Sequence, residues 1–150
     1  MLCNFSLAND SNMPTGILIG QHEWNMHYNS DFAGFEYDVY RRTVVMHWNV
    51  SGFDFTDIPS YLANKIDMVL DEVYYLEVVA RDSEMPDNED RTLTSISYCN
   101  NNEDPIQKWD GGIPAGCLLH PGNNCHIVFN FLGGQIIRIG AHSCNVILCE

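Results

Sequence analysis

Several segments of the chain alternate apolar and polar residues with a period of two, and this pattern restricts the possible folds more than any other feature. Successive side chains of a β-strand point to opposite faces, so such a segment is typical of a strand with one buried face. The clearest example is Thr43–Val50. The residues of this strand that we expect in the core are Val44, Met46, Trp48 and Val50.

An aromatic-rich segment, Phe35–Tyr40, precedes this strand. Arg41 and Arg42 separate the two segments, so we expect the chain to turn back there and form a hairpin, although no Gly or Asn marks the turn.

The C-terminal part of the chain predicts a second hairpin around Gly133 and Gly134. A two-residue loop at these glycines would place Phe129 opposite Arg138. A three-residue loop, Gly133–Gln135, keeps the apolar residues of both strands on one face, and we therefore expect it. The expected pairs are Phe131 with Ile137, Phe129 with Ile139 and Ile127 with Ala141. Another strand is expected at Asn145–Cys149.

Two further strands are expected in the middle of the chain. Val73–Ala80 alternates, with Glu77 on the polar face. Arg91–Cys99 is rich in Thr, Ser, Ile and Tyr, which suits a partly exposed antiparallel strand. The polar segment Asp82–Asp90, which contains Pro86, then predicts a long hairpin connection between them.

The segment from Asp57 to about Leu70 allows two interpretations. Asp57 can cap a helix, Pro59 fits its first turn, and later apolar residues have helical spacing. Alternatively, a short helical turn precedes a strand that begins at Ile66, because the residues after it also alternate.

Together these segments predict one domain, residues 1–150, with a mainly β fold. We expect an antiparallel β-sandwich or open barrel with at most one or two short helices. The length and the 45% hydrophobic content suffice for one sizeable core. Residues 100–124 read as a long loop broken by Pro and Gly.

The N-terminal segment and the cysteines bear on the compartment. Met1–Gly20 has no basic side chain and no long apolar run, so we expect neither a signal peptide nor a membrane span, and a cytoplasmic location. In that compartment the cysteines are expected to be thiols. They are Cys3, Cys99, Cys117, Cys125, Cys144 and Cys149.

No recognised catalytic or metal-binding motif is present in the sequence. His22, Glu23 and His27 look superficially like a zinc protease motif, but histidines five residues apart on a helix diverge by about 140°. The sequence has no CxxC spacing, no nucleophile elbow and no phosphate-binding loop, and Cys117 with His120 alone is not diagnostic of a site. We therefore expect no metal or cofactor and assign no catalytic residue.

The charge is the feature that points toward function. Twenty Asp and Glu against seven Lys and Arg give a formal net charge of −13, which repels nucleic acids and anionic membranes and attracts basic partners. The expected partner-binding carboxylates are Asp82, Glu84, Asp87, Glu89 and Asp90, joined by Glu103 and Asp104. The alternative is a solvated acidic loop.

Trp109 lies in the long loop, where a tryptophan can either cover one end of the core or anchor a partner. We take it as the expected anchor of the acidic surface.

The strand pattern of residues 126–148, together with Val73–Ala80, resembles a small class of β-rich bacterial cytoplasmic proteins. Some of them are immunity proteins of toxin systems. The resemblance implies an acidic binding protein, such as an immunity protein or inhibitor that neutralises a basic partner, for example a nuclease toxin. Two alternatives remain at this point: an enzyme whose site is built from dispersed His and Asp residues in loops, and a structural or oligomer-forming β domain.

Overall fold

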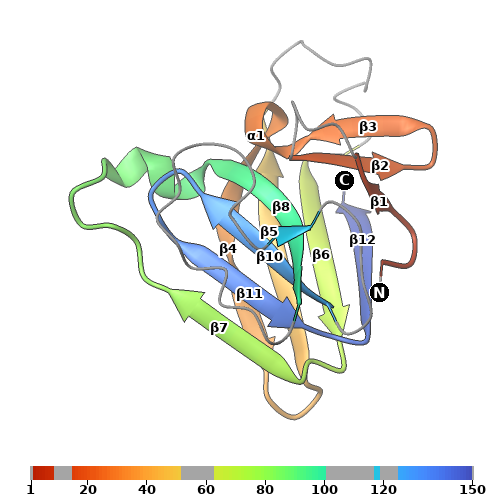
Figure 1. The fold of residues 1–150 in the computed structure, drawn as a ribbon. Helices are drawn as coiled ribbons and strands as arrows, with labels where there is room; N and C mark the ends of the chain where they lie inside the picture. Colours follow the sequence, from red (N-terminus) through yellow and green to blue (C-terminus); the bar gives the residue numbers. More distant parts are fainter. Residues whose placement is uncertain (1, 9–14, 52–62, 101–116, 119–124, 150) are drawn as a thin grey trace.

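Figure 1 shows a computed structural model of the chain, which describes residues 2–8, 15–51, 63–100, 117–118 and 125–149. The described residues form three antiparallel sheets, with one short α-helix and one 3-10 helix. The expected mainly β antiparallel fold with few helices is therefore confirmed. None of the described helices is long and apolar enough to cross a membrane.

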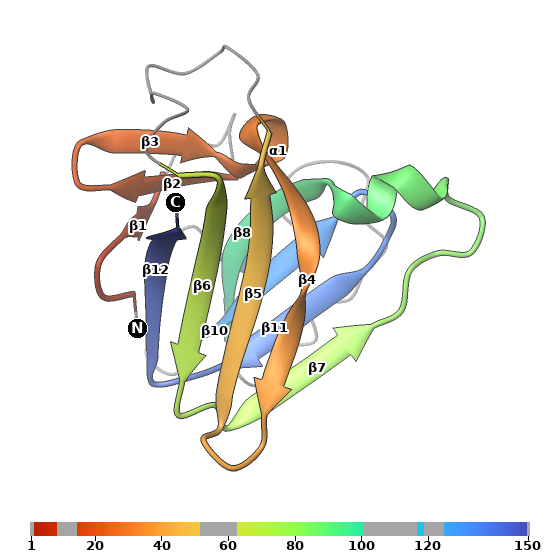
Figure 2. The same ribbon diagram turned by 180° about the vertical axis from the view of Figure 1, so that it is seen from behind.

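Two of the sheets pack face to face as a sandwich (Figures 1 and 2). The four-stranded sheet has the order β12-β6-β5-β4, and its strands are β4 (Ser30–Asp38), β5 (Thr43–Val50), β6 (Lys65–Asp71) and β12 (Ser143–Cys149). The five-stranded sheet has the order β7-β11-β10-β8-β9. Its strands are β7 (Tyr75–Val79), β8 (Leu93–Asn100), β9 (Cys117–Leu118), β10 (Cys125–Phe131) and β11 (Ile136–Gly140).

Aromatic side chains join the two sheets at the centre of the core. Trp48 of β5 is fully buried, and its ring centroid lies 6.0 Å from that of Phe129 in β10. Phe32 of β4 contacts Phe131 in the same way, at 4.5 Å. The strand predicted at Thr43–Val50 is therefore confirmed. Val44 and Met46 are fully buried as expected, and Val50 packs at the margin of the core.

The predicted hairpin between β4 and β5 is also confirmed, and Asp38 explains how it turns without Gly or Asn. The Asp38 carboxylate accepts hydrogen bonds from the backbone N–H groups of Tyr40 and Arg41. Arg42 then adopts a positive φ of 52°, which brings the chain back into β5. A side-chain cap of this kind replaces the glycine that a tight turn usually needs.

The β10–β11 hairpin has three loop residues, as predicted, but the predicted register is wrong by two residues. Phe129 pairs with Ile137 and Ile127 with Ile139. The loop is Leu132–Gly134, because the Phe131 N–H donates to the Gln135 carbonyl at 3.0 Å. Gly134 has a φ of +84°, and the third residue of such a loop is the one that adopts the left-handed conformation. The apolar faces stay on the same side because the shift is an even number of residues.

The strands predicted at Val73–Ala80 and Arg91–Cys99 exist as β7 and β8, but they do not form a hairpin. β7 pairs with β11, and β10 and β11 lie between β7 and β8. The segment between them therefore crosses from one edge of the sheet to an inner position and contains the 3-10 helix η1 (Asp87–Arg91). As an inner strand, β8 is buried along Leu93–Cys99, so the expected partial exposure is wrong as well.

β6 settles part of the ambiguity between Asp57 and Leu70. It is a strand from Lys65 to Asp71, so the continuous helix to Leu70 is wrong and the strand of the alternative is confirmed. Both of its neighbours, β5 and β12, are strands that pair with it antiparallel, and this pairing overrides the helical spacing. Residues 57–62 lie outside the described part.

A third, small sheet lies across one end of the sandwich (Figure 1). It consists of β1 (Ser6–Leu7), β2 (Gly16–Ile19) and β3 (His22–Asn25), and α1 (Met26–Asn29) follows it directly. Ile17, Trp24 and Met26 bury their side chains in the core. This sheet was not predicted, although Gly20, whose φ is +64°, marks the two-residue β2–β3 turn.

Candidate functional site

The acidic segment Asp82–Asp90 is an ordered part of the surface that Arg81 holds together. The Arg81 Nε lies 2.7 Å from Asp90 Oδ2, and its Nη1 lies 3.2 Å from Asp87 Oδ1. The same guanidinium donates to the carbonyl of Met85. One arginine, which directly precedes the loop, thus contacts residues in its middle and at its end.

The loop is also fixed to the β10–β11 turn. The Asp82 N–H donates to the carbonyl of Gly133 at 2.9 Å, and the Gly133 N–H donates to that of Glu89 at 3.2 Å. A Cβ at Gly133 would lie 2.1 Å from Asp90 Oδ1 and 3.1 Å from the Asp90 backbone N, so any larger residue here would displace the Asp90 carboxylate. Residues that are far apart in the sequence therefore determine where the carboxylates point.

The five loop carboxylates fall into two groups. Asp82, Glu84 and Asp87 are exposed, whereas Glu89 and Asp90 are half-buried. Asp90 serves the loop itself through its pair with Arg81. Five of the seven predicted carboxylates therefore lie on one described loop, and three of these five face solvent. Glu103, Asp104 and Trp109 lie outside the described residues.

Four of the six Lys and Arg side chains in the described part contact groups within the molecule, among them the exposed Arg41, whose Nε lies 3.7 Å from Asp38 Oδ2. Lys65 lies 3.2 Å from Asp67, Arg81 is held in the acidic loop, and Arg138 is buried. The exposed arginines of the described part are Arg41, Arg42 and Arg91. The negative surface charge is therefore offset by few exposed cations.

A buried polar cluster on the outer face of the five-stranded sheet was missed by the sequence analysis. Arg138 of β11 is 4% exposed and donates from Nε to His126 Nδ1 at 3.0 Å and from Nη2 to the Asn100 carbonyl at 2.9 Å. A carboxylate oxygen of Glu77 lies 3.9 Å from the Arg138 Nη1. The Tyr75 ring lies under the guanidinium, 5.1 Å from Cζ, and stacks on His126.

His126 is neutral in this cluster, because its Nδ1 accepts the hydrogen bond from Arg138. Burial lowers the pKa of His126, and the positive charge of Arg138 lowers it further, whereas Glu77 opposes the shift. The cluster joins β7, β8, β10 and β11. The cluster therefore holds these four strands together on the outer face of the sheet.

A histidine–carboxylate pair lies on the outer face of the four-stranded sheet. His47 Nδ1 lies 2.7 Å from Asp67 Oδ1. Burial would raise the pKa of Asp67, but hydrogen bonds from His47 and Lys65 and the charges of those two residues lower it overall. Cys149 Sγ contacts the other carboxylate oxygen at 3.8 Å. The thiol contacts the carboxylate and not the imidazole. The three residues therefore do not form a nucleophile–base relay, in which the imidazole would accept the proton of the thiol.

The histidines of the apparent zinc motif lie in different elements. His22 is exposed in β3, whereas His27 is half-buried in α1 and its Nδ1 lies 2.7 Å from the Leu93 carbonyl. In the described part of the chain, no three His, Cys, Asp or Glu side chains gather where they could hold a metal ion. Each of the five cysteines whose side chain is described is a thiol.

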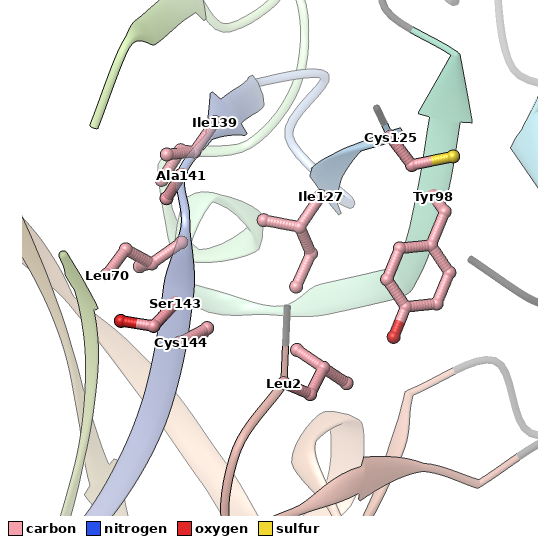
Figure 3. Close-up of a pocket in the computed structure, with 9 residues that line it drawn as sticks. All are labelled: Leu2, Leu70, Tyr98, Cys125, Ile127, Ile139, Ala141, Ser143 and Cys144. Carbon is pink, nitrogen blue, oxygen red and sulfur yellow. The ribbon is translucent and has the colours of Figure 1, made fainter. Parts of the chain in front are cut away.

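A small cavity opens between the two large sheets near the N-terminal segment (Figure 3). Its volume of about 30 Å³ leaves room for one or two water molecules rather than a substrate. Burial raises the pKa of Tyr98 and of Cys144, both on its wall, to about 12. The lining residues are Leu2, Leu70, Tyr98, Cys125, Ile127, Ile139, Ala141, Ser143 and Cys144.

Comparison with protein-family models, with curated proteins and with solved structures found no match to this chain.

Proposed function

We propose that this protein acts by binding, and that a basic protein partner docks on the acidic loop Asp82–Asp90. The observation that carries the proposal is the geometry of this loop. Asp82, Glu84 and Asp87 face solvent from a loop that Arg81 and Gly133 already hold in shape. A partner would therefore meet carboxylates that need little ordering on binding.

The charge of the whole chain supports the same partner class. A net charge of −13 attracts a cationic protein at long range and speeds its encounter with the loop. An immunity protein or inhibitor that neutralises a basic toxin has this requirement. Glu103, Asp104 and Trp109 are part of the proposal as further contacts.

The test begins with capture of a basic protein from the source cell on the immobilised chain. Association rates are then measured for the triple variant D82N/E84Q/D87N, which spares the half-buried Glu89 and Asp90. We expect roughly a tenfold slower association and a weaker salt dependence, as for the loss of electrostatic steering.

The matched control is the triple variant E23Q/D31N/E36Q, which removes the same charge from exposed positions on β3 and β4. It should slow association much less. Failure to capture any basic protein, or equal effects of the two triple variants, would show that the loop is not a docking surface.

A further inference from the structure

The edges of the two large sheets differ in how they are protected. At β12, the Asn4 side chain donates to the Val146 carbonyl at 2.7 Å and accepts from the Val146 N–H at 2.8 Å, as a neighbouring strand would. At β4, the register shifts between Phe32 and Gly34. Covering an edge and distorting it both prevent pairing with another chain. In contrast, β7 pairs with β11 without any shift and lies at the margin of the molecule in both views (Figures 1 and 2).

The hydrogen bonds of β10 show which backbone groups of β7 point outward. The Phe131 N–H bonds to the Gln135 carbonyl beside β11, and the Leu132 N–H bonds to the Thr92 carbonyl beside β8. Because hydrogen-bonded pairs alternate along an antiparallel ladder, Ile136, Arg138 and Gly140 of β11 direct their backbone groups to β7. On β7 itself, the N–H and C=O groups of Leu76 and Val78 therefore point away from the sheet.

The two faces of this edge have different chemistry. On the inner face, Leu76 packs at the margin of the core and Val78 is 44% exposed. On the outer face, Glu77 is partly exposed. β7 leads directly into the acidic loop, so carboxylates continue beyond its C-terminal end. A strand that fits here has apolar residues on one face and cationic residues on the other.

We propose that an extended segment of the basic partner adds to the five-stranded sheet along β7, an inference that rests on the proposed function. The added strand bonds to the backbone of Leu76 and Val78, covers Val78 with an apolar side chain and places a Lys or Arg beside Glu77. A second copy of this chain fits poorly, because a pairing centred on Glu77 sets that carboxylate against its own copy.

The probe is a seven-residue peptide, acetylated and amidated, that alternates lysine with valine. Hydrogen exchange of the full chain is measured with and without it. We expect the Leu76 and Val78 amides to exchange at least about tenfold more slowly with the peptide, because each amide gains a partner, whereas β4 amides do not change. A peptide that alternates glutamate with valine should have no effect.

Val78→Pro removes an outward N–H without removing a bond to β11, and edge strands tolerate proline at such positions. It should weaken binding of the lysine–valine peptide about tenfold, since it also blocks pairing beyond that point. Val78→Thr keeps the N–H and the branched shape and should bind within about twofold of the unaltered chain, because the backbone groups are intact.

Three results would overturn the proposal: unchanged exchange at Leu76 and Val78 with saturating peptide, equal protection by the glutamate peptide, or a dimer in sedimentation that Val78→Pro abolishes. The exchange measurement uses the unaltered chain, so it decides the matter even if Val78→Pro does not fold. If a captured basic protein binds through the loop without protecting β7, the edge inference fails and the proposed function stands.

Discussion

Gly140 allows the buried polar cluster to form. It lies opposite Tyr75 in the β11–β7 ladder, on the same outer face as His126. A Cβ at this position would lie 2.6 Å from the Tyr74 ring and 2.7 Å from the His126 ring. The absence of a side chain is what lets these rings approach each other over β11.

Gly140→Ala is therefore expected to destabilise the protein by about 1–3 kcal/mol, the usual cost of overpacking. Urea unfolding measures the loss. The same substitution in a Tyr74→Ala background should cost less, because one of the two rings is gone. An equal cost in both backgrounds would show that the methyl group meets only His126.

The neutral state of His126 makes stability depend on pH. Its pKa is lowered in the folded protein by burial and by Arg138, so the unfolded chain takes up a proton first as the pH falls. Stability should be full above about pH 6.5, the ordinary value for histidine, and should decrease below it. Among the described residues, Arg138 donates to this imidazole, the rings of Tyr74 and Tyr75 contact it, and the charge of Glu77 acts on it.

The check is the free energy of unfolding in urea between pH 7 and pH 5. His126→Gln, which keeps an acceptor for Arg138, should flatten the dependence in this range. Asp67→Asn is the contrasting variant. The pKa of Asp67 is lowered, so its contribution is present above pH 3.8 and is lost as the pH falls through its folded value. A dependence between pH 7 and pH 5 that persists in His126→Gln would contradict the assignment.

The burial of Arg138 could not be predicted from the sequence. Its partners come from β7, β8 and β10, so its environment depends on a strand order that alternation does not reveal. Val44, Met46 and Trp48 were predictable because one strand's own alternation places them in the core.

At the scale of elements, local pattern was sufficient for most of the longer strands and insufficient for their partners. β5 was predicted to the residue, whereas β7 and β8 were predicted as strands and wrongly paired. A polar segment between two strands favours a hairpin only when nothing else pairs with them, and β11 pairs with β7. The β10–β11 register depended on which loop residue is left-handed, and Gly133 and Gly134 both allow it.

The order of the acidic loop is a property of Arg81. Arg81→Gln removes the contacts to Asp87, Asp90 and Met85, so we expect faster hydrogen exchange at the amides of residues 84–89. Mass-resolved exchange at neutral pH measures this. Arg91→Gln is the matched control, since Arg91 is exposed at the end of the same loop. If both variants change loop exchange equally, the effect comes from lost charge rather than from the Arg81 contacts.

At the scale of the whole molecule, the charge imbalance costs stability as well as attracting partners. The charge of −13 creates self-repulsion that is lost when the chain unfolds and expands. The intramolecular pairs of Lys65 and Arg81 relieve it only locally. Burial of the apolar core must therefore offset this repulsion in the folded protein. The same excess of carboxylates that lowers stability is the one that we propose attracts a basic partner.

Added salt should therefore stabilise the folded chain. We expect the thermal midpoint to rise between about 10 mM and 200 mM NaCl, where the Debye length falls from about 30 Å to below 10 Å and screens repulsion between distant carboxylates. Sucrose at matched osmolality serves as the control for solvent exclusion, which acts without ions. The triple variant D82N/E84Q/D87N should show a smaller rise, because it starts with three fewer charges. A fall in the midpoint with salt would mean that the ion pairs around Arg81 and Asp67 outweigh the repulsion, and that the net charge does not lower the stability of the fold.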